Sequence, residues 1–152
     1  VLTRILKSFD EVEEKKLAEL KLEMAKSELF IKNLVNQTKI SNETILLGLN
    51  YIQKIKLKQG KVKDREIDFG RVFLTSVILA DTMLNDNPYS VKAWSMASGV
   101  CSEDLVKMKV EFCSLLDYEL NLGWRDFQSW LSSLEEFLEF LGETSGLNSI
   151  NR

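Results

Sequence analysis

The sequence predicts an all-α fold, because of its few turn residues, its composition and its apolar periodicity. One proline and seven glycines in 152 residues are too few for the many tight turns of an all-β fold. Hydrophobic residues make up 45% of the chain, which is enough to bury a core. They recur at spacings of three and four, as in amphipathic helices. At this length we expect one domain, with a short helical extension at one end.

The first predicted helix begins near residue 8. Ser8 and Glu11 have the spacing of a capping box, in which each side chain satisfies a free backbone donor at a helix start. A narrow apolar stripe follows among many Glu and Lys residues. Its members are Val12, Leu17, Leu20, Met24, Leu29, Phe30, Leu34 and Val35. Such a helix can pack on its own domain or on a partner, and the sequence leaves both interpretations open.

The second predicted helix begins at Ser41-Asn42-Glu43, a capping residue followed by an acid in the first turn. Its apolar residues between Ile45 and Ile55 recur at helical spacing. A lysine-rich connection around Gly60 follows, from Lys54 to Arg65. This connection either recruits an acidic or phosphorylated partner or is a solvated loop, and solvated loops are the commoner case.

The third predicted helix, from Phe69 to Leu84, has apolar residues all around its axis. A helix of this kind is buried among others, so we expect it to be the central one. Pro88 disfavours the α conformation of the residue before it, which ends the helix in the Asn85–Asn87 segment.

Three further helices are predicted after Pro88. The first is short, with a cap at Ser90 and a break at Gly99, and the next opens with a cap at Ser102 and two first-turn acids. The last follows Gly123 and is rich in aromatic residues, which either pack on the domain or form an exposed ligand platform. The aromatic residues at its start are Trp124, Phe127 and Trp130. Residues 142–152, rich in Gly, Ser and Asn, are predicted to fray.

Composition also excludes several classes of function. The chain has no histidine, so it offers no histidine general base, catalytic triad or histidine-liganded metal. Cys101 and Cys113, twelve positions apart, do not make a zinc site, and we predict a non-enzymatic protein without cofactors. A net charge of -3 requires neither a nucleic acid nor a membrane as partner. With no signal peptide or membrane-spanning run, nucleus or cytoplasm is the expected location.

Four strings of the sequence resemble the five-helix cyclin box. Three of them are similar to the family's second, third and fifth helices, and the other resembles the segment after the third helix in fungal PHO/PCL cyclins and cyclin Y. The strings are Thr44–Ile55, Phe73–Asp86, Glu111–Leu120 and Leu84–Trp94. The resemblance implies a cyclin box over residues 27–121. It leaves an N-terminal amphipathic helical extension over 1–26, and a C-terminal helix with its tail over 122–152.

The resemblance also implies a function, which is to bind and activate a cyclin-dependent protein kinase. In such cyclins a kinase helix packs against helices three and five, where a lysine and a glutamate make polar contacts. Here Thr82 stands at the lysine position, Asp81 precedes it, and Lys109 stands at the glutamate position. Either Asp81 and Lys109 form a charge-swapped pair, structural or facing the kinase, or the usual kinase contact is lost.

Four further residues match positions that bear apolar contacts to the kinase in the cyclins that this chain resembles. They are Met83, Phe112, Tyr118 and Leu120. Periodicity alone would place them in the core, and the resemblance makes an interface equally plausible. The alternatives to a kinase regulator are a cyclin-fold interaction module or transcription-factor-like scaffold without a kinase partner, and a self-associating helical bundle.

Overall fold

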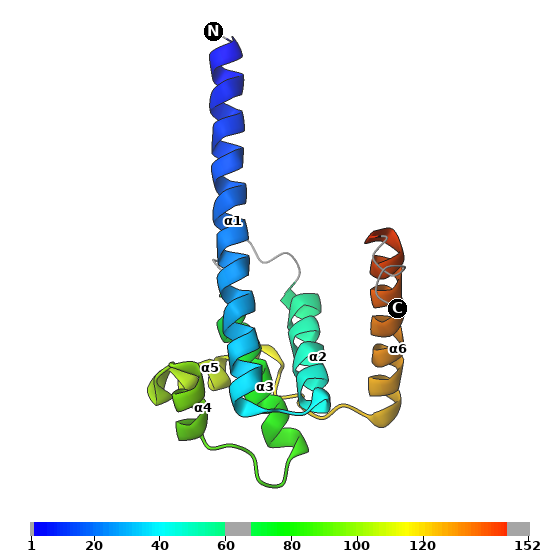
Figure 1. Ribbon diagram of the computed structural model, residues 1–152. Helices are drawn as coiled ribbons and strands as arrows, with labels where there is room; N and C mark the ends of the chain where they lie inside the picture. Colours follow the sequence, from blue (N-terminus) through cyan, green and yellow to red (C-terminus); the bar gives the residue numbers. More distant parts are fainter. Residues whose placement is uncertain (1, 60–67, 146–152) are drawn as a thin grey trace. The chain divides into compact units, whose positions relative to one another are not determined.

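The computed structural model describes residues 2–59 and 68–145, and these form six helices and no strand (Figure 1). The predicted all-α fold is confirmed. The helices are α1 (Leu2–Thr38), α2 (Asn42–Gln59), α3 (Phe69–Leu84), α4 (Val91–Ser98), α5 (Ser102–Leu115) and α6 (Trp124–Ser145). They divide into two compact units, one holding α1 to α5 up to Tyr118 and the other holding α6 from Glu119 onward.

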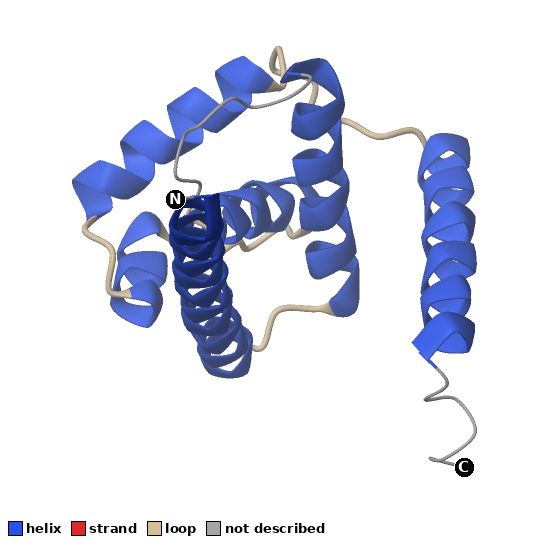
Figure 2. Ribbon diagram, turned by 90° about the horizontal axis from the view of Figure 1, so that it is seen from above, coloured by secondary structure: helices blue, strands red, loops and turns tan. Residues whose placement is uncertain are grey.

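Helix α3 is the centre of the first unit, as the sequence predicted. Every residue from Phe73 to Asp81 is buried. Helices α1, α2 and α5 all pack against α3, and Figure 2 shows this unit with α1 seen nearly end-on. Leu34 of α1, Trp94 of α4 and Leu105 of α5 complete the buried cluster around α3. This burial of large side chains supplies most of the stabilisation of the unit.

Two glycines let the helices approach α3 closely. A Cβ atom on Gly48 of α2 would lie 3.1 Å from Cγ1 of Val77, and one on Gly70 of α3 would lie 2.8 Å from Cδ1 of Phe30 in α1. Side chains at these two positions would push the helix axes apart. The glycines therefore help to set the packing of α1 and α2 on the central helix.

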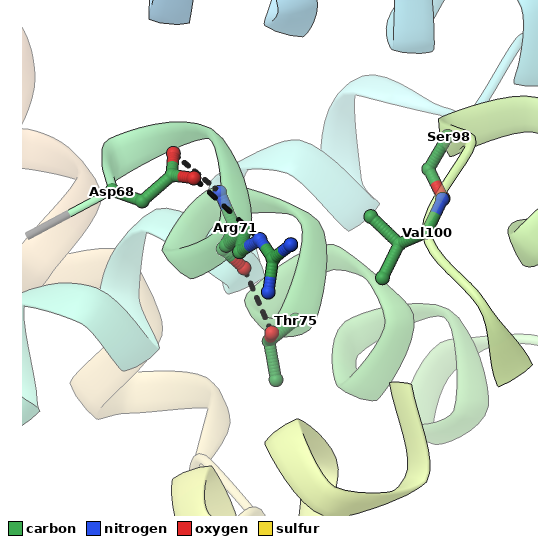
Figure 3. Close-up of polar contacts among 5 residues, drawn as sticks. All are labelled: Asp68, Arg71, Thr75, Ser98 and Val100. Atoms are coloured by element: carbon green, nitrogen blue, oxygen red, sulfur yellow. Dashed lines mark hydrogen bonds and ion pairs between the residues drawn. The ribbon is translucent and has the colours of Figure 1, made fainter. Parts of the chain in front are cut away.

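The start of α3 is fixed by a cap that the sequence analysis did not identify (Figure 3). Oδ1 of Asp68 accepts a hydrogen bond from the backbone N–H of Arg71 at 3.3 Å, and the Arg71 side chain lies 3.6 Å from Oδ2. One turn later, the Thr75 hydroxyl donates to the carbonyl of Arg71 at 2.8 Å. Asp68 satisfies one of the free donors of the first turn, which is the usual role of an aspartate at this position.

Two predicted caps are confirmed and one is displaced. The backbone N–H of Thr44 donates to Oγ of Ser41, and that of Ala93 donates to Oγ of Ser90. Gly99, at φ 76°, adopts the left-handed conformation that ends α4. The predicted cap at Ser102 is wrong by one residue, because α5 begins at Ser102 and Cys101 holds the cap position without a side-chain bond.

The predicted start of the first helix at Ser8 is wrong. Helix α1 begins at Leu2 and runs without a break to Thr38, so Ser8 lies inside it. The physical reason is that neither Gly nor Pro interrupts this segment, and serine in a helix interior costs only a few tenths of a kcal/mol. The predicted boundary between residues 26 and 27 falls within α1. Side chains become partly buried from Ser27 onward, whereas those described before it are exposed.

The two remaining predictions concern the connection after α2 and the C-terminal helix. Residues 60–67, which include the second half of the lysine-rich connection, lie outside the described residues, as do residues 146–152 of the predicted tail. Helix α6 continues to Ser145, so the prediction that fraying begins at residue 142 is wrong. On α6 the rings of Phe127 and Trp130 lie 6.1 Å apart, and Trp124 is exposed.

Candidate protein-binding surface

The last turn of α3 leaves the core and presents side chains to solvent. Thr82, Met83 and Leu84 are exposed, directly after the buried Asp81. The Thr82 hydroxyl donates to the carbonyl of Ile78 at 3.0 Å, within its own helix. The predicted positions Thr82 and Met83 are therefore accessible, and Leu84 adds a third exposed residue that the sequence analysis did not single out. A buried helix that ends in an exposed turn gives such residues a rigid support.

Asp81 has a structural role rather than an accessible one. Its side chain is 3% exposed, and its two carboxylate oxygens accept hydrogen bonds from Nδ2 of Asn85 and, at 2.9 Å, from the backbone N–H of Tyr89. These bonds fix the path of the connection between α3 and α4. Among the described residues Asp81 makes no ion pair with Lys109, so the interpretation of these two as a bonded charge-swapped pair is wrong. The carboxylate binds the backbone and side chain of the segment that directly follows α3.

The connection after α3 is also tied to the end of α1. The Tyr89 hydroxyl donates to the carbonyl of Thr38 at 2.8 Å, and the Tyr89 ring meets Trp94 edge to face at 5.7 Å. These residues, with Gln37, Ala93 and Ala97, line a hollow of about 100 Å³. Nε1 of the buried Trp94 has no partner in the described structure. A hollow of this size can hold water that accepts from this group.

Helix α5 has a buried face and an exposed apolar edge. Leu105, Phe112 and Leu116 are buried, with Phe112 only 6% exposed, so this predicted contact residue belongs to the core. Val106 and Val110, one helical turn apart, are half-exposed or more. The sequence analysis did not single them out. Their exposure could have been predicted, because at helical spacing Val106 and Val110 lie on a different side of α5 from Leu105 and Phe112.

Lys109 lies at the border between the exposed and the buried residues of α5. It is partly buried. Burial raises the pKa of the nearby Cys113 thiol above its ordinary value, and the positive charge of Lys109 offsets a smaller part of that rise. Burial also raises the pKa of Tyr51 on α2 to about 12, and the neighbouring Cys113 adds to that shift. Lys109 is thus a cation at the edge of a largely apolar environment.

The remaining two predicted residues fall at the end of α5 and beyond it. Tyr118 is 68% exposed, and its backbone N–H donates to the carbonyl of Cys113 at 2.8 Å. Leu120 is partly buried and belongs to the second unit. Thr82, Met83 and Tyr118 are therefore accessible and Lys109 partly so, whereas Asp81 and Phe112 are not. We define the cyclin-box surface as Thr82, Met83, Leu84, Val106, Lys109 and Val110.

This surface consists of four apolar side chains, one threonine and one cation, a composition suited to binding a protein. Across residues 2–59 and 68–145 no three Cys, Asp or Glu side chains gather in a way that could hold a metal ion. Within the same ranges, none of the helices combines the length and apolarity needed to span a bilayer.

Comparison with known proteins identifies the family. The family model described as cyclin, N-terminal domain, matches residues 5–121, which include α1 to α5 almost completely. The chain belongs to the cyclin family. The predicted membership of the cyclin box family is thereby confirmed, whereas the predicted bounds of the box at residues 27 and 121 stay a prediction.

Named relatives of this cyclin come from fungi and plants. PHO85 cyclin-5 of Saccharomyces cerevisiae is 33% identical over 106 residues, which cover 66% of this chain and 46% of that protein. Cyclin-U1-1 of Arabidopsis thaliana is 26% identical over 121 residues, 80% of this chain and 58% of the relative. The chain thus spans about half the length of these two relatives. No solved structure matches it. The predicted similarity to PHO-type cyclins is confirmed.

Proposed function

We propose that this cyclin is a non-enzymatic regulatory subunit that binds and activates a cyclin-dependent protein kinase through the cyclin-box surface. Membership of the cyclin family supports the class of partner, and the name of the relative PHO85 cyclin-5 agrees with it. The observation that carries the proposal is the exposure of Met83, Val106 and Val110 on helices that pack against each other. Exposed apolar side chains on a rigid support are typical centres of binding energy.

The proposed mechanism requires no chemistry from the cyclin itself. A kinase that interconverts between inactive and active conformations is shifted toward the active one by a partner that binds this conformation better. The buried α3 and the hydrogen bonds of Asp81 hold the last turn of α3 in place, so little ordering cost arises on binding. We place this activity in the nucleus, the cytoplasm or both.

The charges on this surface favour a partner with an acidic group. Lys109 is partly buried, and covering it by a partner without a counter-charge would be costly. We therefore expect a carboxylate of the kinase to lie opposite Lys109. The same observation supports the second candidate, a cyclin-fold interaction module or scaffold for an acidic partner that is not a kinase. Met83, Val106 and Val110 are exposed in the described structure, so the N-terminal helix does not cover them.

Pull-down from the native source separates these candidates. Immobilised wild-type chain is expected to retain a cyclin-dependent kinase, identified by mass spectrometry, and Val110→Asp is expected to lose it, because Val110 is 57% exposed. Leu22→Asp is the matched control, since Leu22 is 56% exposed but lies on α1, outside the cyclin-box surface. Recovery of another protein in place of a kinase, lost on Val110→Asp, would favour the scaffold. Equal kinase recovery by all three chains would refute the proposed surface.

A further inference from the structure

The N-terminal half of α1 has an apolar stripe that no described residue of its own unit covers. Each described side chain from Leu2 to Lys26 is exposed, and Figure 1 shows this half extending beyond the other helices of the first unit. Six large apolar residues there, at successive spacings of three, seven, five, three and four, fall on one side of the helix. They are Leu2, Ile5, Val12, Leu17, Leu20 and Met24, between 49% and 76% exposed. At 1.5 Å per residue, the stripe is about 33 Å long.

This stripe continues the face that the same helix buries in the cyclin box. Ile31 follows Met24 by seven residues and Leu34 follows Leu20 by fourteen, so each pair lies on one side of the helix. Leu34 belongs to the buried core and Ile31 packs against it. The helix face that forms the core in its C-terminal half thus extends into solvent in its N-terminal half.

Two charged residues interrupt the exposed stripe near its middle. Glu13 lies four residues before Leu17, and Lys16 lies four residues after Val12 and four before Leu20, so both fall on the stripe face. Neither residue suits an apolar groove. In an antiparallel pair of two such helices, however, the glutamate of each helix faces the lysine of the other. A polar pair within an apolar seam is a known device for fixing the orientation and register of helix pairs.

We propose that the N-terminal half of α1 pairs with the same segment of a second copy of this chain, antiparallel and centred between residues 14 and 15. Glu13 of each copy then faces Lys16 of the other. In the same register Val12 faces Leu17 and Ile5 faces Met24. A parallel pair in register places Glu13 against Glu13 and Lys16 against Lys16, which repel. The antiparallel pair is two-fold symmetric, so it closes as a dimer and does not grow into a filament.

Charge reversal at the two interrupting positions tests this dimer in the 152-residue chain. Sedimentation velocity over micromolar concentrations is expected to show a wild-type dimer. Glu13→Lys and Lys16→Glu each place like charges in the seam, and each is expected to raise the dimer dissociation constant about tenfold or more. The double variant Glu13→Lys/Lys16→Glu restores complementary pairs and is expected to dimerise like the wild type. An equimolar mixture of the two single variants is likewise expected to form a heterodimer.

Glu11→Lys is the matched control, because it makes the same charge change on the opposite side of the helix, away from the stripe. It is expected to leave dimerisation unchanged. A wild-type chain that stays monomeric, a double variant that fails to dimerise, or equal weakening by Glu11→Lys and Glu13→Lys would each overturn the proposal. The measurement contains no kinase and involves no residue of the cyclin-box surface. Its failure would therefore leave the proposed function untouched.

Discussion

Replacing Asp81 by alanine is expected to destabilise the cyclin box. The carboxylate is 3% exposed and accepts two hydrogen bonds, from Asn85 and from the Tyr89 backbone. Hydrogen bonds to a charged group contribute about 1.5–3 kcal/mol each. Both donors lie on residues that are themselves exposed, so water replaces part of the lost bonding, and we use the lower end of that range. The expected loss in the free energy of unfolding is about 3 kcal/mol.

Urea denaturation followed by circular dichroism measures this loss. The midpoint is expected to fall in Asp81→Ala without a change in the slope with denaturant. Asp86→Ala, an exposed residue of the same connection, is the control and is expected to change stability by less than about 0.5 kcal/mol. If Asp81→Ala is as stable as Asp86→Ala, the structural role assigned to Asp81 is refuted. In that case Asp81 would return to consideration as a residue that faces the partner.

Two further predictions concern the core. Phe112→Ala is expected to lower the free energy of unfolding by about 3–5 kcal/mol, because Phe112 is buried. A loss below about 1 kcal/mol in the same urea denaturation would contradict the assignment of Phe112 to the core. The free energy of unfolding is also expected to fall as pH rises above about 10, by up to about 1.4 kcal/mol per pH unit. The reason is that the pKa of Tyr51 is about 12 in the folded chain and about 10 in the unfolded chain, so the unfolded chain loses this proton first. Tyr51→Phe is expected to flatten this decline in denaturation curves recorded from pH 9 to 12, and an unchanged decline would show that Tyr51 does not cause it.

Helical periodicity and residue punctuation were sufficient to predict most of the fold. The apolar residues all around the axis between Phe69 and Leu84 predicted a central helix, and α3 has those bounds and that burial. Ser41 and Ser90 predicted helix starts because a capping side chain acts on its own backbone neighbours. Ser8, by contrast, gave a wrong prediction of where the first helix begins. A capping motif permits a helix start but does not require one when the preceding residues also favour a helix.

The candidate surface was harder to predict, because exposure depends on how helices pack. Phe112 and Val110 are both apolar and two residues apart on α5, but one is buried and the other is exposed. The resemblance to cyclins placed Asp81 next to Thr82, the position expected to contact the kinase. The structure shows that its carboxylate turns to Asn85 and Tyr89, residues whose approach depends on the path of a loop. Side-chain direction at such a helix end follows from tertiary contacts rather than from local sequence.

The most direct test of the proposed function is kinase activity in a reconstituted mixture. A cyclin-dependent kinase recovered with this chain is purified without it, and phosphorylation of a peptide substrate is measured as the chain is added. We predict that the rate rises to saturation with wild-type chain and with Leu22→Asp, and that Val110→Asp gives no rise at the same concentrations. A rate that does not increase with wild-type chain would contradict the central claim that this cyclin activates a kinase.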